Sequence, residues 1–142
     1  MLFFGHIAIA LAAAETTQSG KAAAVLGNLT PDIVDKTGCW ILKVMPRGRW
    51  LAHGLPFMII IFAATRPLLP KEHWRGFVLG YLSHLAADHY NGGKLPWLAP
   101  FQEPPPSRHH DHLRLFIITL IPEVLGLAYI AWKAQKDAGT SP

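Results

Sequence analysis

The stretch GYLSHLAAD, residues 80–88, decides the fold of this chain and its chemistry. Gly80, Ser83 and Ala87 form a stripe of small residues at helical spacing, which lets a neighbouring helix approach closely. His84 and Asp88 are four residues apart, so both side chains lie on one face of a helix, next to that stripe. We therefore predict a tightly packed helix that presents a His and an Asp to the same point.

The composition around this stretch is apolar and poor in charge. The chain has 142 residues, of which 51% are hydrophobic and 15% are charged, whereas an average soluble protein has about 25% charged residues. This excludes a disordered chain, and the single cysteine excludes an internal disulfide framework. Ala and Leu dominate and no sustained period-two alternation is present, so we predict an all-α fold in one domain.

Four apolar segments favour a membrane location. They cover residues 1–14, 50–65, 76–87 and 115–132. Each is short for a simple crossing, which takes about 20 apolar residues, or carries an ionisable residue. Two interpretations are open: the core helices of a compact soluble protein, or a small integral membrane bundle whose polar residues face one another. We favour the multi-pass membrane bundle because residues 55–64 and 115–121 are apolar all round.

Glycine and proline residues divide the chain into helices. A break at Ser19-Gly20 should turn the first two helices into an N-terminal hairpin, and Pro31 should end the second. We predict one membrane-embedded helical domain over residues 1–136 and a polar tail over 137–142. The predicted helices cover residues 3–17, 21–29, 50–65, 73–90 and 111–134.

This helix order brings distant polar residues to one face of the bundle. Imidazole nitrogens and carboxylate oxygens are good zinc ligands, so we predict a metal site at this face, with zinc as the ion. Its ligands would be His6, Asp32, His53, His84 and Asp88.

Each of these residues also has a simpler interpretation. His84 and Asp88 can be a hydrogen-bonded pair that helps a helix to pack, and Asp32 and Asp35 can cap a helix. Of those two carboxylates we expect Asp35 to be the cap and Asp32 the ligand. The alternatives for Glu123, inside the last apolar segment, are a functional carboxylate or a pairing with a nearby polar group at a Pro122 kink.

Other polar residues extend the predicted site. The cluster RHHDH, residues 108–112, offers His109, His110 and His112 as additional metal ligands. The basic residues Arg47, Arg49 and Lys94 are predicted on the same face, where they would position a phosphate. Lys and Arg residues are otherwise scattered rather than clustered, which argues against nucleic acid as a partner and fits anionic lipid headgroups instead.

The order of these motifs resembles a known family. Gly5-His6, Pro31-Asp32, the WLAHG motif of residues 50–54 and the GYLSHLAAD stretch follow one another as in the YdjM-like inner-membrane proteins, described as membrane-bound metal-dependent hydrolases. The resemblance covers roughly residues 5–101. The ligand order is also similar to that of zinc-dependent phospholipase C, an all-helical fold. The resemblance implies an inner-membrane location and the same five ligands, with a later one among His109, His110 and His112.

Our leading functional hypothesis is a membrane-bound, zinc-dependent hydrolase that acts on a phosphoester, with membrane lipid as the expected partner and candidate substrate. Bound zinc would activate water, and Asp32 and Asp88 are the predicted catalytic carboxylates, since either can also bridge two ions. One alternative is a non-catalytic membrane protein with a structural metal or partner-binding role. Another is a haem-binding membrane protein, because two histidines on facing helices can ligate haem.

Overall fold

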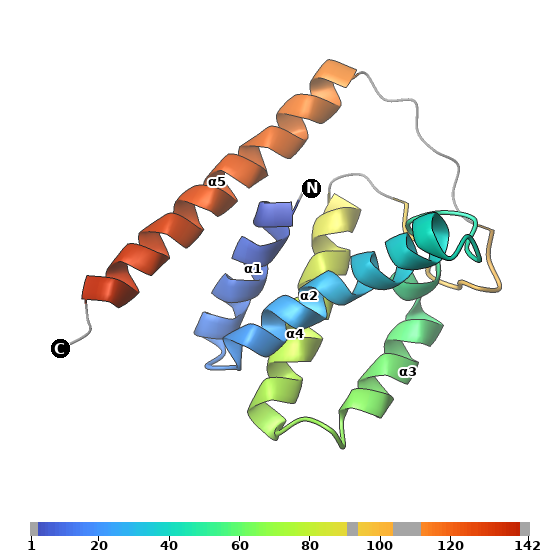
Figure 1. The fold of residues 1–142 in the computed structure, drawn as a ribbon, viewed down its shortest axis with the longest axis horizontal. Coiled ribbons are helices and arrows are strands. Elements are labelled where there is room, and N and C mark those ends of the chain that lie inside the picture. Colours follow the sequence, from blue (N-terminus) through green and yellow to red (C-terminus); the bar gives the residue numbers. More distant parts are fainter. Residues whose placement is uncertain (1–2, 91–93, 104–111, 140–142) are drawn as a thin grey trace.

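The computed structural model describes residues 3–90, 94–103 and 112–139, and the regular structure in these ranges is entirely helical (Figure 1). This confirms the predicted all-α class. A π-helical turn at Thr37–Ile41 and a short 3-10 turn at Leu51–His53 connect the longer helices. Those helices are α1 (Phe3–Thr16), α2 (Lys21–Lys36), α3 (Leu55–Thr65), α4 (Lys71–Tyr90) and α5 (His112–Gly139).

The first two helices form a hairpin: α1 runs one way and α2 returns across it (Figure 1). The predicted end of the second helix at Pro31 is wrong, because α2 continues to Lys36. A proline inside a helix removes one backbone hydrogen bond. Here Pro31 is buried and α2 packs along α4, so tertiary contacts outweigh the missing bond and carry the helix on to Asp35.

Helices α2 and α4 approach until their backbones touch. A Cβ atom on Gly27 would overlap the carbonyl group of Phe77, and one on Gly80 would overlap the carbonyl oxygen of Ala24. The fully buried Asn28 donates from Nδ2 to the carbonyl oxygen of Gly80 at 3.3 Å. The predicted small-residue stripe of α4 therefore packs against α2 at Gly80 and Ser83, and this close contact fixes the register between the two helices.

Helix α3 covers the other side of α4 with aromatic and aliphatic side chains. Tyr81 is fully buried, and its ring lies 5.3 Å from that of Phe62, edge to face. The Tyr81 hydroxyl donates to the carbonyl oxygen of Ala52. This bond fixes the 3-10 turn, so the predicted helix over 50–65 begins as a regular α-helix only at Leu55.

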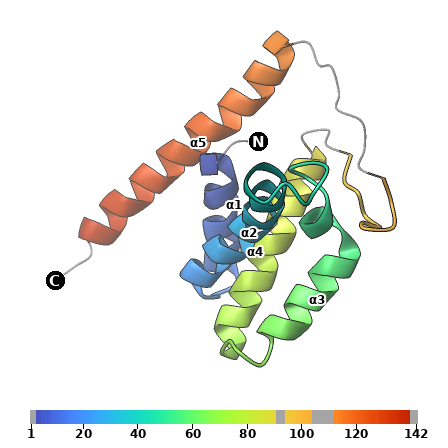
Figure 2. The same cartoon turned by 45° about the vertical axis from the view of Figure 1, so that its right-hand side comes forward.

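Helix α5 lies along α1 on the side away from α3 (Figure 2). The Glu123 carboxylate accepts hydrogen bonds from the backbone N–H groups of Phe4 (2.8 Å) and Gly5 (3.1 Å). These are free donors at the first turn of a helix, where a negative charge is stabilising. Of the two alternatives for Glu123, the structure thus shows the pairing with polar groups. Helix α5 continues through Pro122 and reaches Gly139.

The expected membrane-spanning helices are not found in the described part of the chain. No helix there combines the length and apolarity that crossing a bilayer requires. Large apolar side chains are nevertheless exposed on several elements, among them Trp40, Ile60, Phe101 and Leu125.

Candidate metal centre

The centre is built first on α4, where the predicted pair lies on one face. His84 and Asp88 are 1% and 0% exposed. Nε2 of His84 lies 3.7 Å from Oδ2 of Asp88. Two polar groups so deeply buried need partners. Because the backbone of α4 fixes their separation, these two side chains need little further ordering to bind one metal ion.

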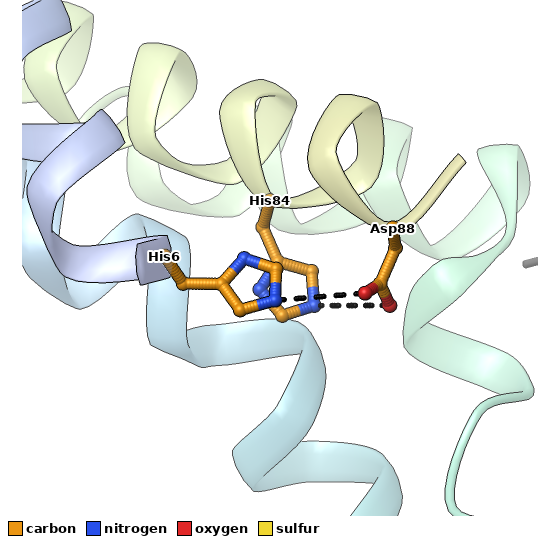
Figure 3. A group of neighbouring side chains, drawn as sticks. All are labelled: His6, His84 and Asp88. Carbon is orange, nitrogen blue, oxygen red and sulfur yellow. Dashed lines mark ion pairs between the residues drawn. The ribbon is translucent and has the colours of Figure 1, made fainter. Parts of the chain in front are cut away.

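Helix α1, which packs against α4, adds His6 to the centre. Its ring stacks on that of His84, with centroids 4.3 Å apart and planes inclined by 18°. Its Nε2 lies 3.5 Å from Oδ1 of Asp88, so both imidazoles point toward the two oxygens of one carboxylate (Figure 3). The Glu123 carboxylate binds the residues just before His6, and α5 therefore helps to place this side chain.

His53 enters from the 3-10 turn after α2. Its Nδ1 is hydrogen-bonded to Oδ2 of Asp35 at 2.7 Å, so its Nε2 is the atom directed at the centre. That Nε2 lies 3.3 Å from Nε2 of His84 and 3.4 Å from Oδ2 of Asp88. Because the charged Asp35 accepts from Nδ1–H, it selects the tautomer in which Nε2 carries a free lone pair.

The prediction that Asp35 is a helix cap is wrong. Asp35 lies in the last turn of α2, fully buried, and its carboxylate also accepts from the backbone N–H groups of Trp50 (2.6 Å) and Ala52 (2.8 Å). It thereby fixes both the turn that carries His53 and the orientation of the imidazole. Sequence reasoning missed this role because the bonds cross a loop of irregular structure, and no local spacing signals them.

Asp32 completes the predicted set from near the C-terminal end of α2. Its Oδ1 lies 4.0 Å from Nε2 of His53 and 3.9 Å from Nε2 of His84. Its Oδ2 forms an ion pair with Lys36 at 2.6 Å. Its side chain is 25% exposed, whereas those of the other four predicted ligands are almost fully buried. Asp32 therefore lies at the edge of the centre that faces solvent.

The five predicted ligands thus converge, and their donor atoms fit a metal. They form two groups that share His84: His6, His84 and Asp88 in one, and Asp32, His53 and His84 in the other, each with donor atoms within 4.8 Å of one another. Two ligand atoms on one tetrahedral zinc ion lie roughly 3.4 Å apart, since zinc–ligand bonds are about 2.0–2.2 Å. Oδ2 of Asp88 is buried and accepts no hydrogen bond from the described residues, as expected of an atom that binds a cation.

The electrostatics favour the metal-binding protonation state at His84 and Asp88, whereas at His53 they favour the protonated form. Burial, and then the neighbouring His6, lower the pKa of His84 to about 3. Burial alone would raise the pKa of Asp88, but His53, His6 and Arg49 outweigh it and hold that pKa far below its usual range. Burial alone would lower the pKa of His53, and the Asp35 and Asp88 carboxylates outweigh it and raise the pKa. At neutral pH His84 is neutral and Asp88 is ionised, as metal ligands must be.

The three predicted phosphate-binding residues are placed differently. Nη2 of Arg49 lies 2.9 Å from Oδ1 of Asp88, and its side chain remains 43% exposed. Arg49 therefore reaches the centre and also borders solvent. Arg47 is half-buried and Lys94 is exposed.

The remaining candidate ligands cannot be placed. His109 and His110 lie outside the described residues, as does the side chain of His112, the first residue of α5.

Comparisons with known proteins agree with the sequence resemblance at the level of family. Neither the curated proteins nor the solved structures include a significant match to this chain. The family model described as YdjM inner membrane protein matches residues 1–140. Because this match covers nearly the whole chain, the chain belongs to the YdjM inner membrane protein family.

Proposed function

We propose that this protein is a divalent-metal-dependent hydrolase of the inner membrane that acts on phosphoesters, with zinc as its ion. The observation that carries the proposal is the convergence of five His and Asp side chains from α1, α2, α4 and the 3-10 turn. His53 in particular is oriented by a buried carboxylate, an arrangement typical of histidines that bind metal.

Different residues of the centre would bind the metal ion and accept a proton. A bound zinc ion would supply a Lewis acid and a water molecule of lowered pKa. His6, His53, His84 and Asp88 would hold the ion in a buried setting. Asp32, partly exposed and with Oδ1 turned to the centre, is placed to accept a proton from an incoming water. Asp88 is the second carboxylate to which we assign a catalytic role, because it faces all three histidines.

Arg49 is the candidate phosphate-binding residue. One guanidinium nitrogen of Arg49 forms an ion pair with Asp88, and the Arg49 side chain is 43% exposed to solvent. A guanidinium offers five N–H donors in a planar fork that matches phosphate oxygens. Arg49 would therefore hold a phosphate at the solvent edge of the centre, and Arg47 and Lys94 would add positive charge farther out. The multi-pass membrane arrangement stays a prediction from the apolar segments.

One observation favours a non-catalytic metal site as the second candidate. Four of the five predicted ligands are nearly inaccessible to solvent, which is also typical of a structural zinc ion with no open position. Haem is a poorer fit, because the rings of His6 and His84 stack on each other and leave no space between them for a macrocycle.

The test is metal content together with phosphoesterase activity. We expect the purified protein to contain zinc, and to hydrolyse p-nitrophenyl phosphate or bis-p-nitrophenyl phosphate until a chelator removes the metal. Adding zinc back should restore activity. His84→Gln should lose both metal and activity, whereas the matched His89→Gln should keep both, since His89 is the exposed histidine of the same helix.

The two candidate functions predict different results. Stoichiometric zinc without hydrolysis of either ester would favour the structural site. Absence of bound zinc in the wild-type protein, even after incubation with the metal, would contradict both candidates.

A further inference from the structure

A groove of about 900 Å³ runs beside the metal centre between α1, α4 and α5. Helix α1 packs against both of the other helices, so it forms the floor of the groove and they form its walls. Each helix contributes a stripe of residues three or four positions apart. The lining residues include Ala8 and Ala12 of α1, Ala86 and Tyr90 of α4, and Leu125 and Tyr129 of α5.

Two of the three hydroxyl groups on the lining residues, those of Ser83 and Tyr129, are turned to other partners. The Ser83 hydroxyl donates to the carbonyl oxygen of Gly80 at 2.7 Å, and the Tyr129 hydroxyl donates to Glu15 at 2.9 Å. The other lining side chains are mostly small or aliphatic. The groove is therefore apolar along its length, and its volume lies within the range of about 300–1,000 Å³ that is typical of small-molecule sites.

The groove and the metal centre lie on neighbouring faces of α1 and α4. Gly5, Ser83 and Ala87 line the groove, and each is followed in the chain by a proposed metal ligand: His6, His84 and Asp88. Consecutive residues of a helix point about 100° apart, so this group of ligands lies one face away from the groove. A molecule that occupies both would have a polar end at the metal centre and an apolar tail along α1.

We infer that the groove binds the acyl chain of an anionic amphiphile whose phosphate lies at the metal centre. This inference rests on the proposed function and specifies its substrate class as phosphate esters that carry a long alkyl or acyl chain. Charge supports this occupant, since the metal and Arg49 attract an anion at one end while the groove accepts only apolar groups. The family's inner-membrane location supplies molecules of this kind at high local concentration.

The test compares two phosphate monoesters that differ only in chain length. Dodecyl phosphate and butyl phosphate would be titrated calorimetrically into zinc-loaded protein held in amphipol, with dodecyl phosphate below its micelle concentration. Each buried methylene strengthens binding about fourfold. We therefore expect dodecyl phosphate to bind at least 100-fold more tightly than butyl phosphate.

A groove-filling variant makes the test specific. Ala86 lines the groove on an exposed part of α4, so Ala86→Trp should fill the space with little disturbance of the fold. It should reduce the preference for dodecyl phosphate at least tenfold and leave the affinity for butyl phosphate within twofold. Ala64→Trp, at an exposed alanine of α3 outside the groove, is the matched control and should change neither affinity.

The outcomes separate the inference from the function on which it rests. An unchanged chain-length preference in Ala86→Trp would overturn the acyl groove, even if the protein hydrolyses phosphoesters. If butyl phosphate fails to bind the wild-type protein, the phosphate site of the proposed function is wrong. Dodecanol binding to the metal-free protein then tests the groove alone, and a tenfold weaker affinity in Ala86→Trp supports it, whereas an equal affinity overturns it.

Discussion

The α2–α4 and α1–α5 interfaces solve the problem of helix packing differently. Between α2 and α4 the backbones touch at Gly27 and Gly80, and no Cβ atom fits there. Between α1 and α5 one such close approach occurs, at Gly126 against the backbone of Phe4, and carboxylates hold the two ends, Glu123 at one and Glu15 at the other. The first interface holds Asp32 beside His84, and Asp35 on the same helix holds His53. The second places only His6 and leaves a groove on its flank. Most of the proposed ligands are thus carried by the α2–α4 interface, where the backbones meet at both Gly27 and Gly80.

Gly80→Ala should have the largest effect on stability and metal binding, because it alters the α2–α4 interface. An alanine would normally stabilise a helix relative to glycine by roughly 0.5–1 kcal/mol, but here its Cβ would overlap the Ala24 carbonyl oxygen. We expect a loss of about 2 kcal/mol or more, as for overpacked cores, together with loss of metal binding. Thermal unfolding followed by circular dichroism measures this.

Gly139→Ala is the control, because nothing lies within 4 Å of a Cβ at Gly139. Its effect should stay within about 0.5 kcal/mol, as is usual for surface substitutions. Equal stability of the two variants would show that α2 and α4 do not touch as described.

Asp88→Asn should have the next largest effect, and on metal rather than on folding. The amide keeps the size of the side chain but removes the charge that faces the three histidines. We expect at least about a 100-fold loss of zinc affinity, in line with the loss of a ligand, with helicity unchanged. Asp137→Asn, an exposed carboxylate near the end of α5, should retain zinc. Retention in Asp88→Asn would refute its role as a ligand.

Asp35→Asn tests a residue of α2 that does not belong to the proposed ligands but holds one of them, His53, in place. Asparagine keeps one acceptor oxygen where the carboxylate has two, so it cannot accept from Nδ1–H of His53 and from the N–H groups of Trp50 and Ala52 in the same geometry, and the imidazole is held less firmly in its orientation and tautomer. Zinc affinity should fall about 10- to 100-fold. A shift in the histidine nitrogen resonances of the zinc-loaded protein would report the changed tautomer. Wild-type affinity and wild-type resonances would restore the cap interpretation that the sequence suggested.

The sequence predicted the parts of the site that depend on local spacing. The spacing of His84 and Asp88 sets their common face, and counting helices brought His6, Asp32 and His53 to the same end of the bundle. The role of Asp35 was not predicted, because it depends on backbone N–H groups of a turn whose path no short-range sequence pattern determines. The extension of α2 through Pro31 escaped for a related reason, since packing against α4 overrides the local preference of proline.

Glu123→Gln should have a moderate effect on the α1–α5 interface. The side chain is 7% exposed and accepts two backbone hydrogen bonds at the start of α1. Glutamine keeps one acceptor oxygen but loses the charge at the helix N-terminus. We expect a destabilisation of about 1 kcal/mol, typical of a lost cap, and a few-fold weaker zinc affinity through displacement of His6. Unchanged stability and affinity would mean that α5 does not position α1.

Glu15→Gln should have the smallest effect, and a distinctive pH dependence. Hydrogen bonds from Lys133 and Tyr129 lower the pKa of Glu15 to about 2, from an ordinary value of 4.5. A carboxylate whose pKa is lower in the folded state adds stability above its unfolded pKa and loses it as the pH falls toward the folded value. The melting temperature of Glu15→Gln should therefore lie slightly below that of the wild type at pH 7, and the difference should shrink between about pH 4.5 and pH 2. Zinc affinity at pH 7 should stay unchanged, because Glu15 lies at the opposite end of α1 from His6. A zinc affinity that fell as far as in Glu123→Gln would show that the two ends of the α1–α5 interface act as one unit, and that α1 moves as a rigid body when either contact is lost.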